Sequence, residues 1–128
     1  MAEVLYPELS YQLVGIAYET FNQLGYGYQE KIYQKALAIE LEKQKIKFKE
    51  QVRCQLVFND KELAYYYLDF LVNDVIILEL KVGNKITKRD FLQVRNYLKL
   101  NKLRLGIIVL FSKNGVVSQR VLNDISKG

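Results

Sequence analysis

The sequence predicts a mixed α/β protein in which helices pack against a central mixed β-sheet. Segments with apolar residues at helical spacing occur beside segments with strand-like alternation, and two nearly continuous apolar runs are typical of strands covered on both faces. No repeat or linker divides the chain, and no Pro follows Pro7, so we expect residues 1–128 to form a single domain. The expected order is α-α-β-β-β-α-β-β, over residues 8–24, 28–44, 48–58, 62–72, 75–82, 87–102, 105–111 and 115–122.

The first two elements are expected to be helices separated by a glycine turn. Residues 8–24 repeat apolar side chains at helical spacing, and Pro7 suits the first turn of such a helix. Gly25-Tyr26-Gly27 ends it, and the second helix follows. The apolar arc of that second helix consists of Ile32, Tyr33, Ala36, Leu37 and Leu41.

Glu30 is anomalous, because its angular position falls inside this apolar arc. A carboxylate that faces a core is costly unless it is paired, hydrogen-bonded or bound to a metal. A first-turn Glu that interacts with the helix dipole and stays half-buried explains the position equally well. The helix alone does not decide between these two interpretations.

The next elements are expected to be strands. Residues 48–58 and 62–72 alternate around Asn59-Asp60, and Asn73-Asp74 marks the turn into the first apolar run, residues 75–82. Asp69 lies in an apolar stretch of the second strand, where a lone Asp is usually a bulge or strand-end residue.

Two charged residues interrupt the apolar run of residues 75–82. Alternation places Glu79 and Lys81 on one face, about 6.6 Å apart along the strand. Taken alone, they are typical of a strand end that carries a salt-bridged pair. With Asp69 they form the pattern D-x9-E-x-K across two adjacent strands. Carboxylate oxygens are hard ligands for Mg²⁺ or Mn²⁺, and a nearby Lys can activate water or neutralise a phosphate, so the pattern favours metal-assisted phosphodiester hydrolysis.

This interpretation sets a condition on the strand register. Asp69 and Glu79 share a face only if they lie opposite each other or two residues off. A two-residue turn at Asn73-Asp74 would pair Asp69 with Leu78 and place the two carboxylates on opposite faces. The functional interpretation therefore predicts an odd-length loop or a bulge.

Residues 87–102 predict a third helix with an apolar and a basic side. Gln93 and Tyr97, spaced i, i+4, lie together on one flank of the apolar side. The basic side is either an ordinary solvated face or a track for a phosphate backbone. The candidate nucleic-acid-binding residues are Lys88, Arg89, Arg95 and Lys99.

The composition excludes several kinds of site. The chain has no His, which excludes Ser-His-Asp and Cys-His catalysis and every His-containing zinc site. Cys54 is the only Cys, so no intramolecular disulfide forms, and we expect a cytoplasmic location. No apolar run of about 20 residues is present, so we expect no membrane partner. The 19 Lys and Arg exceed the 14 Asp and Glu, and the net charge of +5 weakly favours a polyanionic partner.

The motifs, in this order, resemble a known family. Gly27–Tyr33 matches the G-x-x-E-x-x-Y signature of the GxxExxY proteins, which belong to the PD-(D/E)xK nuclease-like superfamily with its restriction-endonuclease-like core. The D-x9-E-x-K pattern follows, and Gln93-x-x-x-Tyr97 resembles the Q-x-x-x-Y motif of the RecB-like nucleases. The resemblance covers about residues 10–122.

The resemblance implies roles for six residues. Asp69 and Glu79 would ligate a divalent metal, and Glu30 would complete the metal site from its helix. Lys81 would assist the nucleophilic water. Gln93 and Tyr97 would orient the site or the substrate strand. The implied catalytic set is Glu30, Asp69, Glu79, Lys81, Gln93 and Tyr97, with Mg²⁺ or Mn²⁺ as the cofactor.

The expected function is a divalent-metal-dependent nuclease, with DNA as the favoured substrate. An alternative is a non-catalytic nucleic-acid-binding or protein-interaction module that retains the fold, and such a module would still bind after loss of Asp69 or Glu79. Ten Tyr residues, among them Tyr65-Tyr66-Tyr67, are compatible with a protein interface. A homodimer is compatible with each of these functions.

Overall fold

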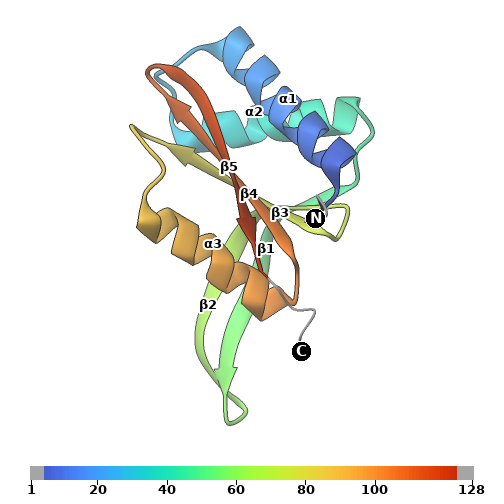
Figure 1. Ribbon diagram of the computed structural model, residues 1–128, viewed down its shortest axis with the longest axis vertical. Coiled ribbons are helices and arrows are strands. Elements are labelled where there is room, and N and C mark those ends of the chain that lie inside the picture. The colour runs from blue at the N-terminus through green and yellow to red at the C-terminus, as the bar shows by residue number, and fades with distance from the viewer. Residues whose placement is uncertain (1–4, 124–128) are drawn as a thin grey trace, which may run out of the picture.

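The computed structural model describes residues 5–123, and within them one sheet of five strands is flanked by three helices (Figure 1). The elements follow the predicted order, and their ends differ from the predicted ones by at most two residues. Their bounds are α1 Pro7–Leu24, α2 Glu30–Lys43, β1 Phe48–Phe58, β2 Lys61–Val72, β3 Ile76–Val82, α3 Lys88–Asn101, β4 Leu105–Ser112 and β5 Gly115–Leu122. No helix in residues 5–123 has the length and apolar content to cross a bilayer.

The strands lie in the order of the sequence, with one parallel pair. β3 and β4 run parallel because α3 connects them as a crossover, and the other neighbours are antiparallel hairpins. Every residue of β4 is buried, as its continuous apolar sequence predicts. The β1–β2 hairpin is the longest pairing, and its far end projects away from the helices (Figure 1).

The α1 and α2 helices cover one face of the sheet. Leu13 and Ile16 of α1 meet Leu37 and Leu41 of α2 over the side chains of β3 and β4. The buried stripe of α2 is narrower than predicted, because Ile32 is 36% exposed while Tyr33 is fully buried. Glu30 is likewise an exposed residue, which favours the second of the two interpretations of its position over a carboxylate that faces the core. The helix dipole explanation of its position fits better, since Glu30 is the first residue of α2.

The α3 helix covers the opposite face, around the buried residues Val94 and Leu98. Thr87 caps its N-terminus: its hydroxyl accepts from the Asp90 N–H at 3.1 Å, and the Asp90 carboxylate accepts from the Thr87 N–H at 3.0 Å. Gly106 of β4 allows close packing, because a Cβ at that position would lie 2.6 Å from Cγ1 of Val94. The helix therefore approaches the sheet more closely than any other residue at position 106 would permit.

The Gly106→Ala substitution is expected to lower the free energy of unfolding by about 1–3 kcal/mol, because the stiff, fully buried Val94 must move to accept the methyl group. Urea unfolding followed by circular dichroism would measure the loss. Gly83→Ala is the matched control, since a Cβ there meets nothing within 4 Å. Equal stability of the two variants would contradict the close approach of α3.

The loop between β2 and β3 satisfies the register condition. The strands pair Phe70 with Leu78 and Val72 with Ile76, which leaves a three-residue loop, residues 73–75. Asn73 and Asp74 adopt left-handed backbone angles, with φ of 51° and 58°. The predicted odd-length loop is confirmed, and this register, extended by one residue beyond the Phe70–Leu78 pair, sets Asp69 opposite Glu79.

Candidate active site

Asp69 and Glu79 lock β2 and β3 together through their side chains. The Asp69 N–H donates to Oε1 of Glu79 at 2.9 Å, and the Leu80 N–H donates to Oδ2 of Asp69 at 2.9 Å. Each carboxylate thus accepts a backbone amide of the opposite strand, at the point where the regular pairing of these strands ends at Phe70 and Leu78. These two hydrogen bonds hold the two acidic side chains close together.

The β1–β2 hairpin changes its course beside Asp69. Residues two apart in a regular strand face the same side of the sheet. Leu68 packs in the core under α3, whereas Phe70 packs in the core under α1 and α2, so the faces of β2 exchange at Asp69. Across from Asp69 on β1, Gln51 has a left-handed backbone with φ of 48°, and it has no pair in the register although its neighbours Glu50 and Val52 do. This irregularity places the Asp69 carboxylate at the junction of the two faces of the sheet.

Lys81 is the next residue on the Glu79 face of β3. Its ammonium donates to Oε1 of Gln93 on α3 at 2.9 Å and lies 3.9 Å from Oδ1 of Asp90. The structure therefore brings together Asp69, Glu79, Lys81 and Gln93, as predicted. Asp90 was missed by the sequence argument, and its signal was the T-x-x-D capping pattern at residues 87–90, which placed a carboxylate in the first turn of α3.

Burial and the charge of Asp69 raise the pKa of Glu79 to about 8, and they outweigh the Asp69 N–H and the Lys81 ammonium, which lower it. Burial, then the charge of Glu79, raise the pKa of Tyr97 to about 12. The Tyr97 hydroxyl therefore remains protonated at neutral pH and is available as a hydrogen-bond donor beside the carboxylates.

Glu30 reaches the site from the start of α2. Glycines at Gly25 and Gly27, with φ of 77° and 119°, form the turn before α2, and the Tyr33 hydroxyl donates to the Gly25 carbonyl at 2.5 Å. Partial desolvation and the charge of Asp69 raise the pKa of the Glu30 carboxyl, and the charge of Lys81 lowers it. The charges of Asp69 and Lys81 therefore act on the Glu30 carboxyl, although the residue as a whole is exposed.

Gln51 links α2 to the carboxylate pair. Its Nε2 donates to Oε1 of Gln34 at 3.0 Å and makes a long contact of 3.5 Å with Oδ1 of Asp69. Gln34 is a partly buried residue of α2, and this hydrogen bond joins it to β1. The left-handed backbone of Gln51 is what presents its amide to both partners.

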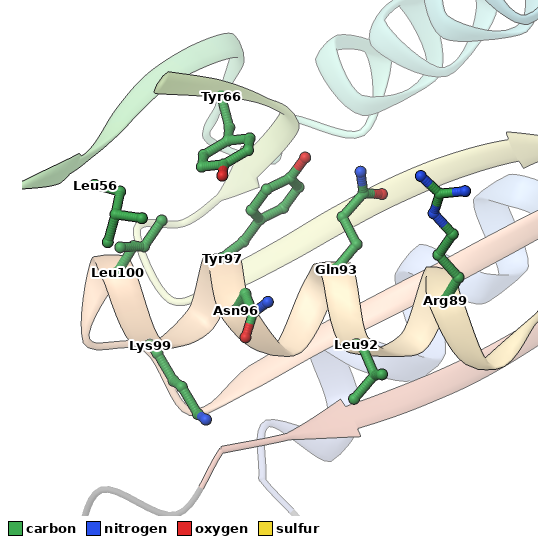
Figure 2. A pocket seen from close by; sticks show the side chains of 9 residues that line it. All are labelled: Leu56, Tyr66, Arg89, Leu92, Gln93, Asn96, Tyr97, Lys99 and Leu100. Carbon is green, nitrogen blue, oxygen red and sulfur yellow. The ribbon is translucent and has the colours of Figure 1, made fainter. Parts of the chain in front are cut away.

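Gln93 and Tyr97 line a groove between α3 and the β1–β2 hairpin (Figure 2). We call it the α3 groove; it has a volume of about 660 Å³ and is lined by Leu56, Tyr66, Arg89, Leu92, Gln93, Asn96, Tyr97, Lys99 and Leu100. Two of the four candidate nucleic-acid-binding residues, Arg89 and Lys99, therefore lie at the groove. Lys88 and Arg95 are exposed on α3 outside its lining.

A model of the PD-(D/E)XK nuclease superfamily matches residues 7–121. The chain belongs to this superfamily. A search of curated protein sequences finds no significant match. The superfamily predicted from the sequence is thus confirmed, and the four residues brought together around β3 lie within the matched range.

Two solved structures are similar to this PD-(D/E)XK protein and differ widely from it in sequence. The crystal structure of SSO0001 matches with a TM-score of 0.58 and 16% identity, over 74% of this chain and 51% of that one, so the chain spans about half of that protein. An alkaline exonuclease, LHK-Exo from Laribacter hongkongensis, has a TM-score of 0.49 and 12% identity, over 99% of this chain and 74% of that one. The superfamily match and the mixed five-stranded sheet together give the restriction-endonuclease-like fold, as predicted.

PD-(D/E)XK nucleases generally use divalent metal ions, and the residues here fit such an ion. Asp69 and Glu79 each give one oxygen to a backbone amide, which leaves Oε2 of Glu79 and Oδ1 of Asp69, the latter only in long contact with Gln51, as hard ligands. Among residues 5–123, no group of three or more His, Cys, Asp or Glu residues is placed to hold a metal. The pair thus supplies two carboxylates, a number that Mg²⁺ accepts when water and substrate phosphates complete its coordination. The role of Glu30 as a third ligand stays a prediction.

Proposed function

We propose that this PD-(D/E)XK protein is a divalent-metal-dependent nuclease that hydrolyses phosphodiester bonds of DNA, with Mg²⁺ or Mn²⁺ held by Asp69 and Glu79. The interlocked carboxylate pair beside Lys81 supports the proposal most directly. Burying two acidic groups next to each other is unfavourable, as the raised pKa of Glu79 indicates, and a divalent cation would relieve this repulsion. When bound, the ion would stabilise the developing charge on the phosphate and lower the pKa of the attacking water.

The chain's own residues have separate tasks in this proposal. Lys81 orients the attacking water or neutralises a phosphate oxygen, and Gln93 fixes its position through the 2.9 Å hydrogen bond. Tyr97 donates a hydrogen bond toward the site, and Glu30 completes the acidic cluster from α2. Arg89 and Lys99 contact the phosphate backbone on either side of the α3 groove, while Lys88 and Arg95 attract it from farther along α3.

One observation favours a second candidate, the non-catalytic binding module. The carboxylates of Asp69 and Glu79 join β2 to β3, so they also have a structural function that needs no metal. A protein that had lost activity would retain the pair for this reason. The exposed rings of Tyr65 and Tyr67, 54% and 49% accessible, would then serve a partner rather than a substrate.

A cleavage assay tests the proposal. Linear and circular DNA and RNA would be incubated with Mg²⁺, Mn²⁺ or EDTA, beside an Asp69→Ala variant prepared identically. We expect cleavage of DNA that needs the metal and is absent in the variant. Absence of cleavage, or equal cleavage by the variant, would reject the nuclease and favour the binding module.

A further inference from the structure

The lining of the α3 groove combines an apolar, aromatic part with a polar part. Its apolar wall is made of the Tyr66 and Tyr97 rings, whose centroids lie 5.5 Å apart, together with Leu56 and Leu100. Arg89, Gln93 and Tyr97 project from the same side of α3, where Tyr97 faces Tyr66 of the hairpin, and Leu92 and Lys99 project from the other side of the helix (Figure 2). A volume of about 660 Å³ lies in the range of small-molecule sites.

Polar groups of the groove retain unused hydrogen-bonding capacity. Gln93 accepts from Lys81 through Oε1, and its Nε2 has no protein partner among residues 5–123. The side-chain amide of Asn96 has none within the same part of the chain. Amide groups beside an apolar, aromatic wall match the edge and the face of a nucleobase.

The charges at the groove favour an anionic chain over a neutral ligand. Neither Arg89 nor Lys99 forms an ion pair within the described residues. On the opposite face of the hairpin, by contrast, Arg53 lies 4.5 Å from the Tyr65 ring and is paired with Glu62 at 2.8 Å. Of the two surfaces compared, the α3 groove and the opposite face of the hairpin, only the groove combines aromatic rings with basic side chains that form no ion pair within residues 5–123.

The groove is continuous with the proposed catalytic site, because Gln93 belongs to both. Its Oε1 holds the Lys81 ammonium while the rest of its side chain lines the groove. A strand whose phosphate lay at Lys81 would therefore place a neighbouring base between α3 and Tyr66.

We propose, resting on the function proposed above, that the α3 groove binds an unpaired nucleotide next to the scissile phosphate. The base stacks on Tyr66, its edge meets Gln93 and Asn96, and Arg89 and Lys99 contact the flanking phosphates. A base can reach Tyr66 only when it is free of its complementary strand, so the substrate is single-stranded at this point.

Fluorescence anisotropy tests this inference without cleavage. A fluorescein-labelled oligothymidylate and a blunt duplex of the same length would be titrated in EDTA against the full chain. We expect the wild type to bind the single strand more tightly than the duplex. The Tyr66→Leu substitution should weaken single-strand binding about 5- to 150-fold, because it removes one stacking surface.

Two variants control for folding and for the face of the hairpin. Tyr66→Phe keeps the ring and should bind like wild type. Tyr65→Leu changes the adjacent Tyr, which faces away from α3 and is 54% exposed, and should leave the affinity within about twofold. Asn96→Ala is a second probe, because Asn96 is exposed and its loss leaves the core intact.

The outcomes separate this inference from the proposed nuclease activity. Equal binding by Tyr66→Leu, Asn96→Ala and wild type would overturn the groove site, and so would tighter binding of the duplex or no binding at all. A loss confined to Tyr65→Leu would place the strand on the opposite face and also overturn it. Metal-dependent cleavage that persists in Tyr66→Leu with unchanged affinity would retain the nuclease and reject the groove.

Discussion

The Glu79→Gln substitution is expected to lower the rate of metal-dependent DNA cleavage by about 10³-fold or more, since loss of a metal ligand removes several kcal/mol of transition-state stabilisation. The change is conservative in shape. The Gln side-chain oxygen can still accept the Asp69 N–H that Glu79 accepts at 2.9 Å, so β2 and β3 stay joined. Initial rates in Mg²⁺ and in Mn²⁺ would measure the loss.

Binding and a control variant separate this effect from misfolding. Affinity for uncleaved DNA in EDTA should be equal to or higher than that of wild type, because a negative charge near the phosphates is gone. Glu42→Gln, an exposed carboxylate on α2, should cleave at the wild-type rate. Full activity of Glu79→Gln would rule out Glu79 as a metal ligand.

The register of the site could be predicted because a chemical requirement and strand geometry act together. Asp69 and Glu79 can cooperate only from one face, and this demanded an odd-length loop, which the structure provides at residues 73–75. Helix positions were likewise predictable, since Pro7 and Gly25 act locally. In each case the deciding interactions lie within a few residues along the chain.

Features that depend on contacts between distant segments could not be predicted. The left-handed backbone of Gln51 has no signal in its neighbours, because its partners Gln34 and Asp69 are 17 and 18 residues away. A helical projection left two interpretations of Glu30 open, because it does not contain the elements that surround the start of α2. The α3 groove exists only because the β1–β2 hairpin projects beside α3 (Figure 1).

The paired carboxylates serve the proposed activity, but burying them together lowers the free energy of unfolding of the metal-free protein. Burial and Asp69 hold the pKa of Glu79 at about 8, above its ordinary value of 4.5. Between these two pH values the folded protein keeps a proton that the unfolded chain releases. The free energy of unfolding therefore falls as the pH rises from 4.5 to 8, and the penalty is complete above pH 8.

We expect this loss to be on the order of 2–4 kcal/mol in the metal-free protein. Urea unfolding in EDTA at several pH values would measure it. Glu79→Gln carries no titrating group at this position, so it should flatten the profile between pH 4.5 and 8 and unfold at higher urea than wild type at pH 8. Matching profiles for the two proteins would contradict the raised pKa. A variant that gains stability at pH 8 while it loses cleavage would identify the buried pair as a metal site retained against its cost to the fold.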